Sequence, residues 1–225
     1  GFEQESLFAL WKFVKGMTLY SNPYSPPYSI AFFNWLYYQT YGPFTSTLLN
    51  ILQLGDDWIP AVSRWMSLIG ASIGSFMAYK AMVAVTETQS NTMRQLCLCL
   101  AIYLMFGPLV GFWAFTIRPD IWGMVFDMSA VFVFWKFYPK HQYRAAIFAS
   151  ILLFCSWSFK HVDIFSAVAI GLFLLFHKKI KVLAVLTSVY FSFVFIVLFV
   201  GSEEYLTTIF LRPATTGFDI GQMPL

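Results

Sequence analysis

Residues 182–201 read VLAVLTSVYFSFVFIVLFVG, a run without a single charged side chain. A helix of about 20 apolar residues is long enough to cross the hydrocarbon core of a bilayer. The whole chain is similar, because 59% of its 225 residues are hydrophobic and only 11% are charged, with a mean hydropathy of +0.67. Since backbone groups in hydrocarbon must be hydrogen-bonded within their own segment, we expect an all-α, polytopic membrane bundle rather than a soluble or nucleic-acid-binding domain.

Working outward from this run, we expect about six membrane-spanning helices. They are residues 62–84, 95–117, 120–138, 144–159, 163–177 and 182–201. The fourth and fifth are short, so they could be tilted or form a broken pair around Lys160. Because no repeat or linker divides the chain, residues 1–225 are interpreted as one domain, with an external loop over 1–61, the bundle over 62–201 and a second external loop over 202–225.

Basic residues predict the orientation of this bundle, because Lys and Arg favour the cytoplasmic side of a membrane. Eight of the 14 basic residues fall in alternate loops and therefore share one face: Lys80, Arg94, Lys136, Lys140, Arg144, Lys178, Lys179 and Lys181. Nine of the 11 acidic residues then lie on the opposite face, the exceptions being Glu87 and Asp127. We therefore expect an integral membrane protein whose N-terminal loop faces the periplasm, the cell exterior or an organelle lumen.

The first 61 residues would begin and end on that outer face, so we expect them to lie along the membrane surface. Residues 7–14 place apolar side chains at i, i+3, i+4 and i+7, which predicts an amphipathic helix, and Gly16 is a typical C-terminal stop. In an alternative topology, residues 28–50 span the membrane and residues 1–27 are cytoplasmic.

A second interfacial helix is expected from about Tyr28, interrupted at Gly42-Pro43. Aromatic rings with a polar tip prefer headgroup depth, and this segment is rich in aromatic residues. They are Phe32, Phe33, Trp35, Tyr37, Tyr38 and Tyr41.

Two ionic clusters interrupt the apolar runs, Arg118-Pro119-Asp120 and Lys160-His161-Val162-Asp163. Ionisable groups within a membrane bundle are costly to bury, so they are candidates for function by default. Two simpler interpretations stay open: the clusters could be short solvated loops, or the cation and the acid of each cluster could pair with one another. Asp127 lies two turns beyond Asp120 on the same helical face and could be a buried polar contact.

Other kinds of site are not indicated. The three cysteines, Cys97, Cys99 and Cys155, lie inside apolar runs, where a free thiol behaves as a small hydrophobic group. No His or further Cys stands near enough to complete a zinc site. There is no Gly-rich phosphate loop and no Ser nucleophile elbow. No metal site is therefore predicted, although the dispersed carboxylates could hold a divalent cation.

Several short motifs follow one another in a characteristic order. They are an acidic residue, an amphipathic helix that ends in Gly before Leu-Tyr, a Pro/Tyr-rich turn, a Trp/Tyr-rich segment, an Arg before a small-residue span, and an Arg-Pro-Asp that opens a later span. The corresponding residues are Glu3-Gln4-Glu5, Lys15-Gly16-Met17-Thr18-Leu19-Tyr20, Ser25-Pro26-Pro27-Tyr28, Asn34-Trp35-Leu36-Tyr37-Tyr38, Ser63-Arg64-Trp65-Met66-Ser67 and Arg118-Pro119-Asp120-Ile121. Over roughly residues 1–200, this series resembles the N-terminal half of the GT-C membrane glycosyltransferases, which include the protein O-mannosyltransferases and the aminoarabinose and related lipid-sugar transferases.

The resemblance implies an enzyme that moves a sugar from a polyprenyl-phosphate donor to a lipid, glycan or protein acceptor at the non-cytoplasmic face. In the family, an acid in the first external loop acts as general base or orients the sugar, and here it corresponds to Glu3 or, as the runner-up, Glu5. A second family acid, at the outer start of a later span, corresponds to Asp120. The donor and membrane lipids are the expected partners, and no bound cofactor is expected with certainty.

Cations are needed at the same place, because the departing phosphate carries negative charge. Lys160 is the first candidate for this contact and His161 the second. Arg118 and Arg64 are further candidates, since a guanidinium group binds phosphate in a bidentate manner.

Members of this family continue through several more helices, so we expect the sequence to be part of a longer protein, and the fragment alone need not be active. Two other functions stay open. The chain could be a non-catalytic accessory subunit of a larger membrane complex, with its aromatic surface facing lipid or partner subunits. It could also transport a lipid-linked or small anionic solute, with Lys160 and Arg118 at a broken-helix site.

Overall fold

The computed structural model describes residues 2–22 and 31–211, and within these ranges every regular element is a helix. The expected all-α fold is thus confirmed. The elements are α1 (Phe2–Val14), α2 (Trp35–Leu52), η1 (Asp56–Trp58), α3 (Ile59–Thr86), α4 (Asn91–Phe106), α5 (Gly111–Ala114), α6 (Asp120–Phe137), α7 (Gln142–Phe159), α8 (Phe165–Phe176), α9 (Ile180–Val200), α10 (Glu203–Leu206) and η2 (Thr207–Leu211).

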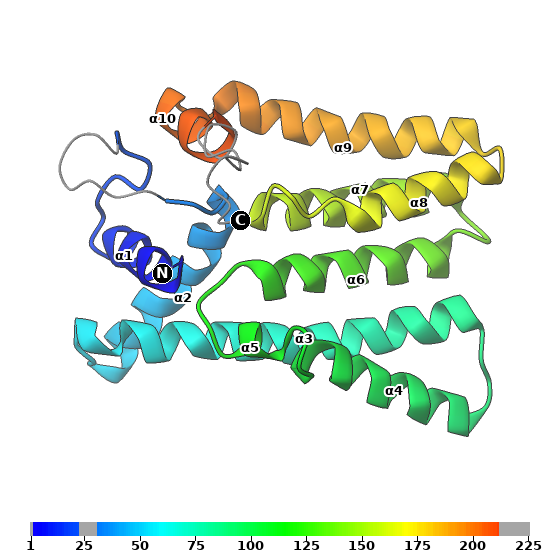
Figure 1. The fold of residues 1–225 in the computed structure, drawn as a ribbon. Coiled ribbons are helices and arrows are strands. Elements are labelled where there is room, and N and C mark those ends of the chain that lie inside the picture. Colours follow the sequence, from blue (N-terminus) through cyan, green and yellow to red (C-terminus); the bar gives the residue numbers. More distant parts are fainter. Residues whose placement is uncertain (1, 23–30, 212–225) are drawn as a thin grey trace, which may run out of the picture.

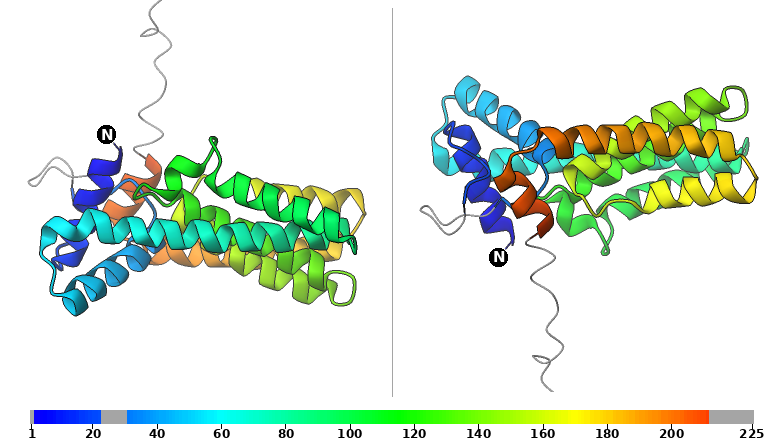
Figure 2. Two further views of the ribbon diagram at one scale, coloured as in Figure 1. Left: turned by 90° about the horizontal axis from the view of Figure 1, so that it is seen from below. Right: turned by 90° about the horizontal axis from the view of Figure 1, so that it is seen from above.

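Six helices, α3, α4, α6, α7, α8 and α9, run side by side along one direction and form an elongated bundle (Figure 1). α6 lies between α3 and α7, and these two contacts are the most extensive in the bundle. The helices α1, α2 and α10 gather at one end, as both further views also show (Figure 2). The turns that join α3 to α4, α6 to α7 and α8 to α9 lie at the opposite end.

Two helical segments are long and apolar enough to cross a membrane, judged by length and composition alone: Asp56–Thr86, which combines η1 and α3, and Ile180–Val200, which is α9. The other four expected spans also coincide with helices, but these do not meet the same test. α4 and α8 are short, with 16 and 12 residues. α6 carries three charged residues, Asp120, Asp127 and Lys136, within its 18 positions, and α7 begins with a polar turn.

The expected span 95–117 is interrupted, which corrects one boundary. α4 ends at Phe106, and the single turn α5 follows only from Gly111. Gly107-Pro108 explains the break, because proline lacks the donor that a continuing helix needs and its ring collides with the preceding turn. As a result, the polypeptide reaches α6 through an irregular segment, 115–119, rather than directly from a long helix.

The N-terminal region contains the two expected helices, with one correction. α1 ends at Val14, and Gly16 takes a φ of +68°, as predicted for the stop. α2 begins at Trp35, whose N–H is accepted by the side chain of Asn34, and it continues through Gly42-Pro43 without interruption. Gly42 is needed there because a Cβ atom would collide with the ring of Phe13 on α1. Tyr28, the expected start, and the turn 25–28 lie outside the described residues.

The aromatic side chains of α2 lie differently from the prediction. Tyr37, Tyr38 and Tyr41 are fully buried in one core cluster instead of facing headgroups. α2 packs against α1, α3 and α7, and this contact covers the rings. Burial of a tyrosine is favourable when its hydroxyl finds a partner, and the sequence alone does not reveal such partners.

Candidate functional site

Asp120 lies at the centre of a charged cluster at the α1 end of the bundle. It is the first residue of α6, where the helix dipole favours a carboxylate, and only 4% of its side chain is exposed. Arg118 Nε donates to Oδ2 over 3.0 Å, and Lys160 Nζ donates to Oδ1 over 2.5 Å. Each carboxylate oxygen therefore has its own cation. The pairing of Arg118 with Asp120, which the sequence left open, is present, whereas Lys160 forms its ion pair with Asp120 of α6 rather than with Asp163.

The two cations also share one aromatic ring. The guanidinium carbon of Arg118 lies 5.6 Å and the Nζ atom of Lys160 lies 5.9 Å from the ring centroid of Trp113. Such cation–π contacts hold cations in place without consuming their hydrogen-bond donors. Since both cations bind one carboxylate and face one ring, they are close enough to contact a single anion of phosphate size.

The segment before α6 is held from several sides. Ser67 Oγ donates to the Thr116 carbonyl over 2.6 Å. The Tyr37 hydroxyl donates to the Ile117 carbonyl over 3.1 Å, and the Tyr41 hydroxyl donates to the Arg118 carbonyl over 3.2 Å. These bonds come from α2 and α3, so the buried tyrosines fix the backbone from which Arg118 and the first residue of α6 project.

Glu3 joins α1 to the same segment. Its Oε1 atom accepts hydrogen bonds from the N–H of Ile117 over 3.3 Å and from Nη2 of Arg64 on α3 over 3.1 Å. The Glu3 side chain is 32% exposed and that of Arg64 is 48% exposed, so this pair is open to solvent. Glu3 and Asp120 thus lie at two sides of the short stretch 117–120, one exposed and one buried.

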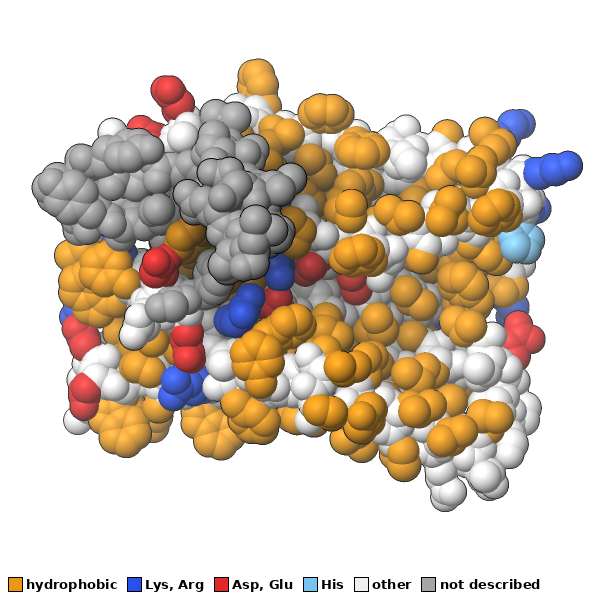
Figure 3. Space-filling view, viewed as in Figure 1, with side chains coloured by type: hydrophobic (Ala, Val, Ile, Leu, Met, Phe, Trp, Pro, Cys, Tyr) orange, Lys and Arg blue, Asp and Glu red, His pale blue; other side chains and the backbone are white. Residues whose placement is uncertain are grey.

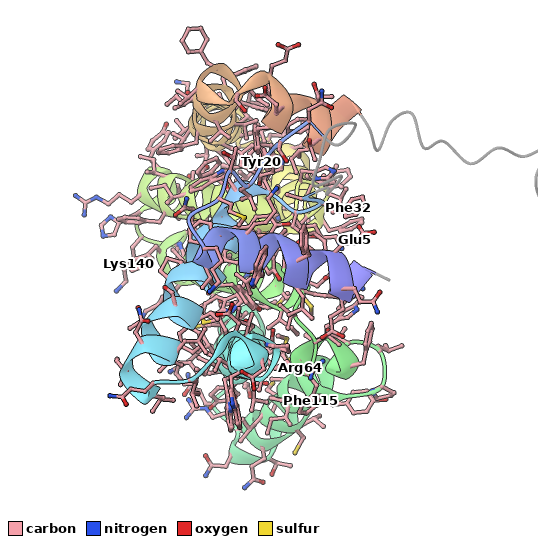
Figure 4. All side chains as sticks on the ribbon, turned by 90° about the vertical axis from the view of Figure 1, so that its left-hand side faces the viewer. Glu5, Tyr20, Phe32, Arg64, Phe115 and Lys140 are labelled. Atoms are coloured by element: carbon pink, nitrogen blue, oxygen red, sulfur yellow. The ribbon has the colours of Figure 1, made fainter. Side chains whose placement is uncertain are left out.

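Glu5 and His161 are not part of this arrangement. Glu5 is exposed and forms no ion pair with a described residue, and Figure 4 shows it on the edge of α1 away from Arg64. The His161 ring instead meets the edge of the Phe210 ring, with centroids 5.7 Å apart. Burial, and to a smaller extent the charge of Lys160, lower the pKa of His161, so this imidazole is neutral and unsuited to bind phosphate by charge.

Asp163 belongs to the ionic cluster 160–163 that the sequence indicated, although no role in the site was assigned to it there. Its carboxylate fills the place that a side chain at Gly123 would occupy, one turn into α6. Burial raises the pKa of Asp163 to about 7, an effect that Lys160 opposes and that the neighbouring Asp127 and Asp120 reinforce. The glycine in the first turns of α6 was the available signal, because it permits a close approach to the helix.

Asp127 lies deeper along α6, beside Ser156 of α7 and Ser166 of α8. One of its oxygens, Oδ1, is buried without a hydrogen-bond partner among the described residues. Asp120 and Asp127 on α6, and Asp163 packed against Gly123 of α6, therefore lie along one side of this helix. No group of three or more Asp, Glu, His or Cys side chains in the described ranges is arranged to hold a metal ion.

An apolar groove of about 400 Å³ opens at this same end of the molecule. Its walls are formed by the C-terminal part of α9 and by aromatic residues of the N-terminal and C-terminal regions, among them Tyr20, Trp35 and Tyr205. Figure 3 shows acidic and basic side chains gathered over the ends of α3 and α6 nearest α1, whereas the remaining bundle surface on this face is largely hydrophobic.

Five of the seven residues expected at the site therefore come together, namely Glu3, Arg64, Arg118, Asp120 and Lys160, while Glu5 and His161 do not. Trp113, Tyr37 and Tyr41 were not expected there, whereas Asp163 was named as part of the ionic cluster 160–163 without a role of its own. Comparison of the chain with protein-family models, with curated proteins and with solved structures found no match.

Proposed function

We propose that this chain forms the donor-binding part of a GT-C-like membrane glycosyltransferase, which moves a sugar from a polyprenyl-phosphate carrier to a lipid, glycan or protein acceptor. One observation carries the proposal: two carboxylates and three cations from four separate parts of the sequence meet at one end of the bundle. These are the residue types that sugar transfer from a phosphate requires.

The chemistry assigns a role to each side of the cluster. In an inverting transfer, a bond forms between the acceptor oxygen and the anomeric carbon, the bond to the carrier phosphate breaks, and a carboxylate takes the acceptor proton. Arg118 and Lys160, which face the same ring of Trp113, would bind the departing phosphate together. Phosphate bound there would compete with Asp120 for both cations and free its carboxylate to take the acceptor proton, whereas the more exposed Glu3 would orient the sugar or the acceptor.

The membrane arrangement supports this function. We propose that the six bundle helices span the bilayer together, that α1 and α2 lie at its outer surface, and that the groove beside Tyr20 and Trp35 receives the polyprenyl chain. The basic residues of the α6–α7 and α8–α9 turns lie at the end opposite to Asp120, as expected if that end is cytoplasmic.

The geometry also favours a second function, that of a non-catalytic accessory subunit. Both oxygens of Asp120 are already bonded to cations, and buried ion clusters of this kind can be purely structural. Under this alternative, the cluster would only fasten α6 to α7.

An activity assay separates the two functions. The full-length protein in membranes would be incubated with radiolabelled polyprenyl-phosphate mannose and glucose, and transfer to lipid, glycan and protein fractions would be measured. We expect Glu3→Gln to reduce transfer at least 100-fold without loss of folded protein, because Glu3 is partly exposed, and the control Asp57→Asn, at an exposed position outside the cluster, to retain it. Equal activity of the wild-type and Glu3→Gln proteins would favour the accessory subunit.

A further inference from the structure

The turn between α8 and α9 and the first turn of α9 carry three exposed lysines, Lys178, Lys179 and Lys181, called here the lysine turn. None of them forms an ion pair with a described residue. The end of α6, the α6–α7 turn and the beginning of α7 add exposed basic residues: Lys136, Lys140 and Arg144. Between Asp163 and Glu203 the sequence contains no acid at all. Positive charge is thus concentrated at this end, where Glu87 of the α3–α4 turn is the one acidic residue among those described. Blue side chains accordingly gather at the right of Figure 3.

A second apolar groove, of about 500 Å³, leads toward this turn between α7, α8 and α9. Its lining extends from Ile164, at the beginning of α8, to Leu175 and Leu183, which lie within one turn of the lysines. Almost the whole lining is aliphatic or aromatic. Gly171 contributes to the width of the groove, because the nearest atom to a Cβ added there would be Leu183 Cδ1, at 3.8 Å.

We propose that this groove and the lysine turn form a binding site for one anionic phospholipid, with an acyl chain in the groove and the phosphate on Lys178, Lys179 and Lys181. The volume lies within the range of about 300–1,000 Å³ that is usual for ligand sites. Clustered lysines at a membrane surface attract anionic headgroups, and their flexible stems reach from the apolar level to the phosphate. The site is separate from the Asp120 cluster and does not depend on the proposed transferase activity.

The charge pattern selects the headgroup. A zwitterionic lipid carries a cation that three unpaired lysines would repel, whereas phosphatidylglycerol presents a net negative charge. The groove in turn selects a lipid over a soluble phosphate, because its apolar lining gains from covering a hydrocarbon chain.

Native mass spectrometry of the full chain, released from micelles that contain equal amounts of phosphatidylglycerol and phosphatidylcholine with the same acyl chains, tests the site. We expect the wild-type chain to retain phosphatidylglycerol about tenfold over phosphatidylcholine. The variant Lys178→Gln/Lys179→Gln/Lys181→Gln should lose this preference while still retaining some lipid. Gly171→Leu, which fills the groove, should reduce retention of both lipids, and Gly171→Ala should do so weakly.

The matched control Lys15→Gln/Lys80→Gln/Arg94→Gln removes the same charge outside helices α6–α9 and should keep the preference. Equal retention of the two lipids by the wild-type chain would overturn the proposal. So would an equal loss of preference in the control, unchanged retention in both Gly171 variants, or displacement of the lipid by excess inorganic phosphate.

Discussion

The two ends of the bundle both carry clustered charge, yet they handle it in opposite ways. At the α1 end, Asp120 is buried and binds Arg118 and Lys160, and the segment 116–118 before it is held by hydrogen bonds from α2 and α3. At the other end, the lysines of the α8–α9 turn are exposed and unpaired within the described chain. The difference teaches that charge at the first end is part of the fold, whereas charge at the second is available to a partner.

The largest effect should come from breaking the buried cluster. Asp120→Asn leaves Arg118 and Lys160 without a counter-charge, and loss of one partner from a buried ion pair costs about 3–5 kcal/mol. Chemical unfolding in detergent micelles measures this change. Asp57→Asn, at an exposed position, is the control and should leave the free energy of unfolding nearly unchanged. A small effect of Asp120→Asn would remove the distinction between the two ends.

A second test concerns pH. The pKa of Asp163 is about 7 in the folded chain and 3.8 as its ordinary value, so the folded state holds this proton more tightly than the unfolded state does. The resulting stabilisation is fully present below about pH 3.8 and is lost as the pH rises through about 7. From this pKa difference of about 3 units, it amounts to at most about 4 kcal/mol.

Asn at position 163 cannot ionise, so the variant Asp163→Asn should not lose stability as the pH rises through about 7 and should be more stable than the wild-type chain at pH 8. Unfolding curves for both proteins, recorded from pH 4 to pH 8 in steps of about one pH unit, give the difference between their free energies of unfolding. Because other carboxylates titrate in both proteins, only their difference is informative. A difference that does not change with pH would contradict the prediction.

A smaller effect is expected from the hydrogen bonds that hold the segment before α6. Tyr37→Phe leaves the buried Ile117 carbonyl without its donor, which costs about 1–3 kcal/mol. Tyr143→Phe, at an exposed position at the beginning of α7, should change the free energy of unfolding by much less. An equal change in the free energy of unfolding for the two variants would show that the Tyr37 hydroxyl does not stabilise the segment before α6.

The smallest effect belongs to the opposite end. Lys179→Gln removes an exposed charge without a described ion pair, so the free energy of unfolding should change by less than about 0.5 kcal/mol. The same denaturation assay in neutral detergent measures it. A loss of more than about 1 kcal/mol would show that this lysine has a structural role after all.

Helix positions could be predicted well, because charged residues and Gly or Pro mark the ends of the apolar runs. Residues 120–138 were expected to form a helix, and α6 spans Asp120–Phe137. The break at Gly107 was missed, since the apolar residues on both sides, such as Phe106 and Val110, conceal a single Gly-Pro pair. Burial of the α2 tyrosines was also missed, because the carbonyl groups that accept from Tyr37 and Tyr41 lie far away in the sequence.

The candidate site was predicted only in part, and not from the local sequence features that predicted the helices. Glu3 and Arg64 are 61 residues apart, so spacing alone could not bring them together, and their selection rested on the resemblance to a family. Physical reasoning about buried charge pointed to Asp120 and Lys160. The same reasoning could not decide whether Lys160 pairs with nearby Asp163 or with Asp120 on α6, because either carboxylate neutralises its charge.

The close approach of Asp163 to Gly123 has a consequence for natural variation. Any side chain at position 123 would displace the carboxylate from its place against α6. Related chains should therefore keep Gly123 wherever they keep Asp163, and should replace the two together. A larger residue at 123 beside a retained Asp at 163 would mark a lineage in which this corner of the bundle has been rebuilt.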